Sequence, residues 1–471
     1  MHLTRLRRSS RSSRSSRSRT AAAVLAAALA VSTGGVATAA DAAPGEARHC
    51  AGQSRATVPG AAFQTTACLP DLTTAALTGT RYTDQADWAS LSAKGTKNPS
   101  GVPGIQIDGY FPDDSKLNTT HGWNHDSQFV IRLPDRWNGK LVVTGAPGTR
   151  KQYALDHLVS DHVLAQGYAF ASHDKGNNGV DFYTDGKRPG DAVAEWHELT
   201  TRLTRTAKQV TKRVYGKAPR RTYMTGISNG GYLTRWQLEN HPELYDGGVD
   251  WEGTLMTAEG PNPFTFLPTA VAYQAGRATH QDMLDAGFAP GSEFLWPYHQ
   301  SIYWGLTQKT YRAEFDPSYD PDCPGASAGS TLEEIVAPCA SDASYDYAQR
   351  PKSVHRALDR ISLTGRIGKP MLTLHGTLDA LLPISVDSDV YTRMVKARGR
   401  EGMHRYYTIE AGTHVDSLYD AYPDRLRPIL PCYRTAFDAL TAWVERGAAP
   451  PPSGTVSKPA TGDVVNSCAL R

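Results

Sequence analysis

The stretch Thr222-Tyr223-Met224-Thr225-Gly226-Ile227-Ser228-Asn229-Gly230 decides the fold that we expect for this chain. Its first four residues are typical of a buried strand, and a helix is expected after Gly230. Between them lies a G-x-S-x-G motif, and this strand-to-helix context is the one that a nucleophile elbow requires. The start of the following helix also favours developing negative charge. We therefore predict that Ser228 is a nucleophile, the alternative being an ordinary glycine-rich turn.

Strands and helices alternate around this motif. We expect strands at 128–133, 140–144, 168–172, 222–225, 370–374 and 405–409, and helices at 153–166 and 191–215. The second helix carries one apolar stripe at intervals of three or four residues, formed by Val193, Trp196, Leu199, Leu203, Ala207, Val210 and Val214. The repeated β-α-β order predicts a mainly parallel sheet with helices on both faces. Together with the elbow, it predicts an α/β-hydrolase fold with a large inserted cap.

The pattern divides the chain into six predicted segments. They are a signal peptide (1–40), an irregular N-terminal segment (41–120), a first part of the hydrolase core (121–259), an inserted cap or lid (260–364), a second part of the core (365–448) and a C-terminal tail (449–471). The cap is distinguished by many aromatic residues, and the tail begins with three prolines.

The N-terminal forty residues predict export. The first nineteen residues hold seven arginines and no acid, an alanine-rich apolar run follows, and small residues indicate cleavage near Ala40. The run is shorter than the roughly 20 apolar residues that a transmembrane helix needs. Arg7-Arg8 leaves export by the twin-arginine route open. We expect a secreted, extracellular protein without membrane association after cleavage. Loss of the seven arginines changes the formal net charge from +3 to −4, so no nucleic-acid partner is expected.

Six cysteines follow the signal peptide, and an even number in an exported protein favours disulfides. They form three neighbouring couples, so among 15 possible connectivities we expect Cys50–Cys68, Cys323–Cys339 and Cys432–Cys468. None has the C-x-x-C spacing of a zinc or redox site.

A serine nucleophile needs an acid and a base, which should follow it in the order Asp, His. Asp379 lies on the loop after a late strand, and we predict that it orients the imidazole and stabilises the imidazolium. Asp387 and Asp389 are local competitors that lie further from the strand end. His414 lies on a glycine-containing loop after the last predicted strand and is the predicted base. His375, just before the acid, is expected to support it.

The tetrahedral intermediate of acyl transfer needs an oxyanion hole. One donor should be the backbone N–H of Asn229, the residue after the nucleophile. The other should lie in the loop after the strand at 140–144, where Pro147 has no N–H, so we favour Ala146. We expect Trp296 and Trp304 of the cap to contact the apolar part of a substrate.

No cofactor and no metal are expected. Trp196-His197-Glu198 lacks the second histidine of H-E-x-x-H, because position 201 is Thr201, and no G-x-x-x-x-G-K-[ST] loop is present. Asp316, Asp320 and Asp322 leave calcium binding open, but their spacing matches no EF-hand loop. A polar, disulfide-closed surface loop is the favoured interpretation.

Several stretches resemble the tannase and feruloyl esterase family, including 3-hydroxybutyrate oligomer hydrolases. They are Leu133-Pro134-Asp135-Arg136-Trp137-Asn138-Gly139-Lys140, the segment from Ala207 through Pro219 into the elbow, and His241-Pro242-Glu243-Leu244-Tyr245-Asp246-Gly247. The resemblance implies an α/β-hydrolase with a large lid that cleaves carboxylic esters, with Ser228, Asp379 and His414 as its triad. Typical members also carry a disulfide between cysteines beside the serine and the histidine, where this chain has Ile227 and Val415.

We therefore expect a secreted serine esterase that acts through an acyl-enzyme on small or oligomeric esters. The missing cysteines favour hydroxyalkanoate oligomers or other polyesters over the usual plant phenolics, although aromatic esters stay open. A serine peptidase on the same fold and a non-catalytic binding protein are the alternatives.

Overall fold

The computed structural model describes residues 50, 52–113, 118–180, 187–325 and 331–471, so the predicted signal peptide lies outside the described residues. Ten strands form one sheet within these ranges. They are β1 (Phe63–Leu69), β2 (Gly104–Tyr110), β3 (Gln128–Pro134), β4 (Lys140–Gly145), β5 (Ala169–His173), β6 (Arg221–Ile227), β7 (Gly247–Trp251), β8 (Met371–Gly376), β9 (His404–Ile409) and β10 (Gly454–Val456).

The strand order is β1-β2-β3-β5-β4-β6-β7-β8-β9-β10. From β5 to β10 every neighbouring pair is parallel, whereas β1, β2 and β3 are joined to one another and to β5 by antiparallel ladders. The six strands predicted from the sequence are β3, β4, β5, β6, β8 and β9. This mainly parallel sheet confirms the predicted α/β-hydrolase fold.

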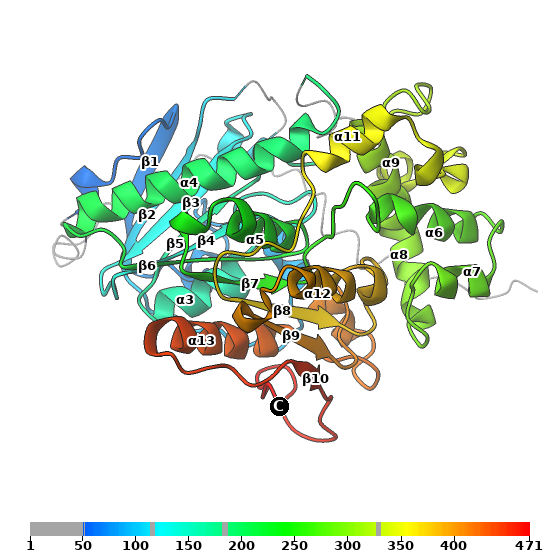
Figure 1. Cartoon of the computed structure of the whole chain (residues 1–471). Helices are drawn as coiled ribbons and strands as arrows, with labels where there is room; N and C mark the ends of the chain where they lie inside the picture. The colour runs from blue at the N-terminus through cyan, green and yellow to red at the C-terminus, as the bar shows by residue number, and fades with distance from the viewer. Residues whose placement is uncertain (1–49, 51, 114–117, 181–186, 326–330) are drawn as a thin grey trace, which may run out of the picture. The chain divides into compact units, whose positions relative to one another are not determined.

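Helices cover both faces of the sheet (Figure 1). They are α1 (Thr74–Leu77), α2 (Gln85–Trp88), α3 (Asp161–Ala165), α4 (Asp191–Tyr215), α5 (Asn229–Asn240), α6 (Leu267–Gln274), α7 (His280–Asp285), α8 (Trp296–Ile302), α9 (Trp304–Phe315), α10 (Leu332–Val336), α11 (Lys352–Asp359), α12 (Ser388–Ala397) and α13 (Leu430–Arg446). On one face α4 and α5 pack against the central strands, and on the other face α3 and α13 do so.

Side chains alternate between two hydrophobic cores, as the pleat of a strand requires. Along β4, Leu141 and Val143 enter the core beneath α4 and α5, while Val142 enters the core beneath α3 and α13. The apolar stripe predicted for residues 191–215 lies on α4, and all seven of its side chains are buried. A stripe of this kind anchors a long helix to the sheet.

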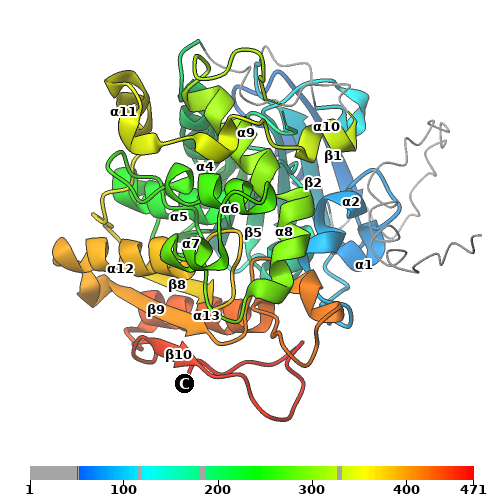
Figure 2. The same ribbon diagram turned by 90° about the vertical axis from the view of Figure 1, so that its right-hand side faces the viewer.

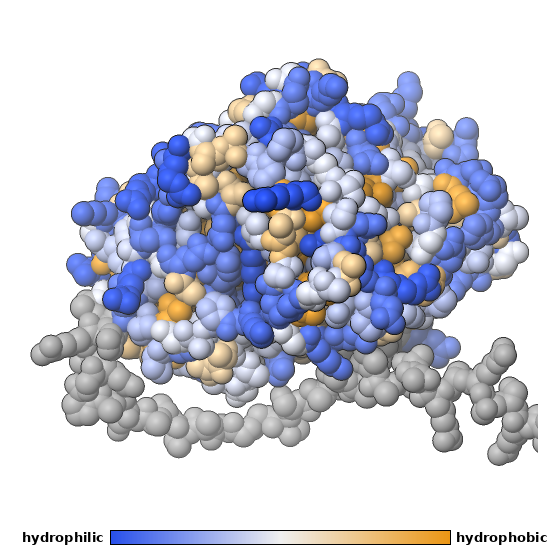
Figure 3. Space-filling model, turned by 90° about the horizontal axis from the view of Figure 1, so that it is seen from below, coloured by the Kyte–Doolittle hydropathy of each residue, from blue (hydrophilic) through white to orange (hydrophobic). Residues whose placement is uncertain are grey.

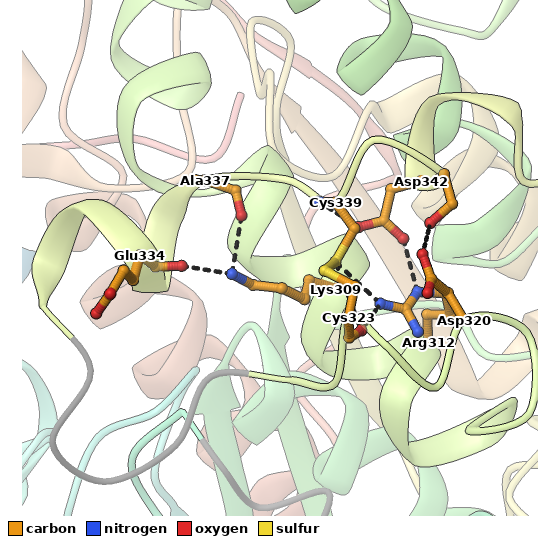
Figure 4. Close-up of a disulfide and its surroundings, with 9 residues drawn as sticks. Lys309, Arg312, Asp320, Cys323, Glu334, Ala337, Cys339 and Asp342 are labelled. Carbon is orange, nitrogen blue, oxygen red and sulfur yellow. Dashed lines mark hydrogen bonds and ion pairs between the residues drawn. A yellow bond between two sulfur atoms is a disulfide. The ribbon is translucent and has the colours of Figure 1, made fainter.

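Between β7 and β8 the described chain forms the helices α6 to α11, joined by loops and short 3-10 turns. These helices lie beside the sheet and face the viewer in Figure 2. Within them the Cys323–Cys339 disulfide lies beside Arg312 of α9, which donates to Cys323 O and pairs with Asp342 at 2.7 Å (Figure 4). Lys309 donates to the carbonyl of Ala337 at 2.8 Å, so polar contacts and one disulfide hold this part together.

The segment predicted to be irregular, 41–120, contains the paired strands β1 and β2, and that prediction was wrong. The signal was weak because β2 holds only two apolar residues in alternation, Ile105 and Ile107, and its polar Gln106 and Asp108 are buried as well. Gln106 accepts from the guanidinium of Arg132 at 2.9 Å, and Arg132 is paired with Asp156 at 2.7 Å. Once every donor and acceptor has a partner, a buried strand can carry charge.

The C-terminal tail is also attached to the sheet. Its strand β10 pairs in parallel with β9, and Cys468 is bonded to Cys432 of α13. The Cys50–Cys68 disulfide joins the chain ahead of β1 to that strand, so all three expected pairs are present. The face of the molecule on which β10 lies carries mostly hydrophilic side chains, with hydrophobic ones in small groups (Figure 3). No helix in the described ranges is long and apolar enough to cross a membrane.

We predict that Leu203→Ala lowers the free energy of unfolding by about 2–5 kcal/mol, because the side chain lies fully buried between α4 and the sheet and its removal leaves a cavity. Chemical denaturation measures the effect. The matched control is Gln209→Ala on the exposed side of the same helix, with an expected change within about 0.5 kcal/mol. Equal effects of the two substitutions would contradict the proposed packing of α4.

Candidate active site

Ser228 lies between β6 and α5 in a conformation that L-residues rarely adopt, with φ 58° and ψ −122°. Its N–H donates to the carbonyl of Trp251 at 3.0 Å, which extends the ladder to β7. Glycine is required on both sides, because a Cβ on Gly226 would lie 2.5 Å from the backbone of Gly230, and a Cβ on Gly230 would lie 2.5 Å from the carbonyl oxygen of Gly145. The close contact of three backbone segments therefore fixes the strained turn.

The three residues predicted as a triad meet at this turn. The Oγ of Ser228 lies 3.1 Å from Nε2 of His414. The Nδ1 of His414 lies 2.8 Å from Oδ2 of Asp379. The exposed fractions are 9% for Ser228, 4% for His414 and 0% for Asp379. This arrangement matches a nucleophile, a general base and an acid that orients it.

Loops after β8 and β9 bring the acid and the base together. A Cβ on Gly376 would lie 2.3 Å from the backbone of Gly412, so the two loops touch backbone to backbone. The carboxylate of Asp379 is held by the N–H groups of Leu381 at 2.7 Å and Leu382 at 2.9 Å. The acid therefore has one fixed orientation toward the imidazole.

The other acids of this region have different partners. Asp387 pairs with Arg235 at 2.9 Å, and Asp389 accepts the hydroxyl of Tyr406 at 2.8 Å. His375 lies 3.3 Å from Oδ2 of Asp379, where the sequence placed it as a supporting residue. Neither competing aspartate therefore reaches the imidazole of the site.

Electrostatics favour an ionised acid and a basic histidine. Burial opposes ionisation of Asp379, but His414 and His375 outweigh it and hold the pKa of Asp379 well below its usual range. Burial also opposes protonation of His414, but the neighbouring carboxylate of Asp379 raises the pKa of His414 above 6.5. Burial lowers the pKa of His375, but the hydrogen bond to Asp379 outweighs this effect, so that the pKa is raised to about 9. The base is thereby made a stronger proton acceptor than a free imidazole.

The assignment of Ala146 to the oxyanion hole was wrong. Its N–H donates to the carbonyl of His173 at 3.0 Å across the β4–β5 ladder, so it is already used by the sheet. The next amides, of Gly148 and Thr149, donate to no acceptor in the described part of the chain. The buried ammonium of Lys175 holds this loop in place, because it donates to Gly148 O at 2.8 Å.

Trp296 and Trp304 lie in the hydrophobic core, contrary to their predicted contact with substrate. Both indoles are at most 2% exposed, and their N–H groups donate to Ser292 Oγ at 2.9 Å and to Ala380 O at 2.8 Å. Large aromatic rings pack where they exclude most water, and sequence position alone does not separate this role from binding. Trp304 does matter to the site indirectly, because it fixes the residue after Asp379.

The sequence did not reveal His299 of α8. It is fully buried, and neither ring nitrogen has a hydrogen-bond partner within the described residues. Burial lowers the pKa of His299 to about 3, and Asp379 and His414 are the charged groups that act on it, so the neutral ring lies near the triad. A lone histidine among fifteen gave no signal at the sequence level.

Glu252, at the end of β7, is a second residue that the sequence did not reveal. Its Oε2 lies 3.7 Å from Nδ1 of His414, on the side chain that Asp379 also contacts. Glu252 has the positive φ of 49° and is fully buried. Glu252 directly follows β7, the strand that pairs with β6 and so lies beside Ser228. This position is the signal that could have identified it.

Glu252, Asp379 and His414 are also the one group within the described ranges whose three ligand atoms lie within 4.8 Å of one another. The imidazole nitrogen concerned is already bonded to Asp379. Of the three aspartates for which calcium binding was left open, Asp316 is paired with Arg350 at 2.6 Å. One ligand atom of each cluster is therefore already engaged by another protein group.

The fold and this site define an α/β-hydrolase, and comparisons with known proteins agree. The crystal structure of feruloyl esterase B from Aspergillus oryzae superposes with a TM-score of 0.50 at 16% identity, over 85% of this chain and 92% of that one. A family model described as tannase and feruloyl esterase matches residues 116–251, and one described as 3HB-oligomer hydrolase matches residues 328–470. The predicted resemblance is thus confirmed, with Ser228 in the first match and Asp379 and His414 in the second.

Two curated relatives each match less than a third of this chain. A D-(-)-3-hydroxybutyrate oligomer hydrolase of a Polaromonas species is 29% identical over 31% of this chain. A mono(2-hydroxyethyl) terephthalate hydrolase of Piscinibacter sakaiensis is 25% identical over 29% of this chain. The alignments span only 22% and 24% of the lengths of these two relatives.

We predict that a fluorophosphonate probe labels Ser228, because the imidazole at 3.1 Å can accept the hydroxyl proton as the phosphorus is attacked. Peptide mass spectrometry locates the label. His414→Ala should slow labelling by at least about 100-fold, whereas Ser344→Ala, at an exposed serine, should leave it unchanged. A label on another serine would refute the assignment of the nucleophile.

Proposed function

We propose that this chain is a secreted serine esterase that cleaves carboxylic ester bonds through an acyl-enzyme. The observation that carries the proposal is the hydrogen-bonded chain from Ser228 through His414 to Asp379 at the carboxyl ends of three parallel strands. The matches to families of ester hydrolases support the choice of esters. Export rests on the predicted signal peptide and agrees with three disulfides.

The mechanism follows from the geometry. Ser228 Oγ attacks the ester carbonyl while its proton passes to Nε2 of His414, and Asp379 stabilises the imidazolium. The tetrahedral intermediate collapses as the imidazolium gives that proton to the leaving alcohol, which leaves an acyl-serine. Water, deprotonated by the same nitrogen, then releases the acid and restores the serine.

The oxyanion of each intermediate needs at least two donors. We assign one to the backbone N–H of Asn229 at the start of α5, whose helix dipole favours negative charge. The second is an amide of Gly148 or Thr149, since their loop begins at the carbonyl of Gly145 that packs on the elbow. Lys175, which holds this loop, keeps that amide in position.

Oligomeric hydroxy esters or small aromatic esters are the substrates that we propose. The two curated relatives act, by their names, on hydroxybutyrate oligomers and on a terephthalate monoester. Both kinds of substrate carry a further polar group close to an ester. His299, buried near the triad with two unpartnered nitrogens, is the side chain that we propose to bind that group.

We predict that the protein hydrolyses p-nitrophenyl butyrate, hydroxybutyrate oligomers or aromatic methyl esters, and that Ser228→Ala lowers kcat by at least about 10³-fold, since the nucleophile is lost. Peptide anilides should be cleaved far more slowly. Initial rates on one panel measure both. Faster cleavage of anilides would favour a peptidase, and no turnover of any ester by the intact enzyme would contradict the proposal.

His299→Phe is expected to raise KM about 10-fold for esters that carry a second hydroxyl or carbonyl, because it removes both ring nitrogens while keeping a planar, somewhat larger aromatic ring. Simple acyl p-nitrophenyl esters should be little affected. The control is His280→Gln on the exposed side of α7. An equal change for both classes of ester would show that His299 serves packing only.

A further inference from the structure

Only one oxygen of the Glu252 carboxylate has a hydrogen-bond partner among the described residues. Its backbone N–H continues the β7–β8 ladder by donating to Leu374 O at 2.9 Å, and its Oε1 accepts the N–H of Gly376 at 2.7 Å. The other oxygen, Oε2, accepts no hydrogen bond within the described residues. Burying a carboxylate with an unused oxygen is costly, and a glutamine could serve Gly376 equally well.

Backbone strain points in the same direction. Glu252 has a φ of 49°, which a non-glycine residue adopts only where its surroundings compel it. Such residues cluster at active sites. Ser228, on the neighbouring strand, has the same property with a φ of 58°. The strained residue after β7 therefore lies next to the strained residue after β6.

Glu252 Oε2 is aimed at the same imidazole nitrogen as the acid. It lies 3.7 Å from Nδ1 of His414, against 2.8 Å for Asp379 Oδ2. We propose that Glu252 is a second carboxylate of the active site, which positions His414, stabilises its imidazolium and partly replaces Asp379 when that acid is lost. The proposal rests on the proposed function of the triad.

The charges around Glu252 suit this role. The ionisable groups that interact with Glu252 are His375 in β8, Asp379 after β8, and His414 and Asp416 after β9. Burial, together with Asp379, raises the pKa of Glu252 to about 7, while the two histidines lower it. When His414 becomes an imidazolium during the reaction, the new positive charge favours the ionised form of Glu252. The glutamate thus supplies negative charge at the step that needs it.

The negative charge of Glu252 determines the direction in which Glu252→Gln shifts the pH dependence of kcat/KM. The value of kcat/KM rises with pH as His414 loses its proton, and an anion beside the imidazole raises the pKa of that step. Glu252→Gln keeps the acceptor for Gly376 and removes the anion. We therefore expect the acidic limb of kcat/KM to move to lower pH by about 1 unit, with kcat lowered about 10-fold.

A double-mutant comparison separates positioning from packing. Asp379→Ala leaves Nδ1 of His414 free to donate to Glu252, so some activity should persist. E252Q should then lower kcat by a factor at least about 10-fold larger in the Asp379→Ala background than in the native enzyme. The reason is that each carboxylate can substitute for the other. Equal costs in both backgrounds, or an unmoved acidic limb, would overturn the proposal.

Glu239→Gln is the matched control. Glu239 is a half-buried glutamate on α5 that accepts the N–H of Gly365 at 2.8 Å and the hydroxyl of Tyr391 at 2.8 Å, away from the triad. The Glu239→Gln variant should have a changed melting temperature, but the acidic limb of its kcat/KM profile should not move. If E252Q does not fold, Glu252→Met removes the anion together with the acceptor of Gly376 N–H, and its acidic limb of kcat/KM should move in the same direction.

The closing experiment needs no substrate. In protein labelled with ¹⁵N-histidine, the titration of His414 is followed by NMR in the native enzyme and in E252Q. A pKa lower by about 1 unit in E252Q is expected, and an unchanged pKa would overturn the role of Glu252. A shifted pKa in a protein that cleaves no ester would instead contradict the proposed function while the pairing of Glu252 with His414 stands.

Discussion

The close backbone contact beneath Ser228 is the constraint on which the site depends. Gly226, Gly230 and Gly145 bring β6, α5 and the end of β4 together at distances that no Cβ would tolerate. The serine is thereby forced into a positive φ, and its hydroxyl is lifted from the sheet toward His414. The same contact sets the loop after β4 beside the nucleophile, where oxyanion donors are needed. Strain at one residue is thus balanced by packing in three segments.

The sequence predicted the central strands and α4 because their patterns come from burial alone. Val142 and Val143 lie in a continuous apolar run, and α4 shows one apolar stripe over its whole length. It did not predict β2 or β7, whose interiors hold polar or small residues. In β7, Gly248 is packed against Met224 O, and Asp250 is paired with Arg235 at 2.6 Å. Such strands are defined by tertiary partners, which a single sequence does not show.

The triad could be predicted because its members occupy fixed places, each on a loop after a parallel strand. The residues that were missed or misassigned depend on three-dimensional detail. The N–H of Ala146 is used by the β4–β5 ladder, and that depends on register. Trp304 and His299 lie on neighbouring helices of the same insertion, yet the first has its N–H satisfied and the second has no partner among the described residues. Both rings are fully buried, and only the fold shows which of them has its polar atoms satisfied.

The absence of the disulfide typical of the resembling family has a physical counterpart here. Ile227 and Val415, at the positions of its cysteines, are both buried in the core beneath α3 and α13. The three disulfides of this chain instead fasten its periphery: the segment before β1, the helical insertion and the C-terminal tail. The serine and histidine loops are therefore held by apolar packing, by the contact of Gly376 with Gly412 and by hydrogen bonds to Asp379. Because none of these is covalent, the geometry of the site depends on the cores on both sides of the sheet.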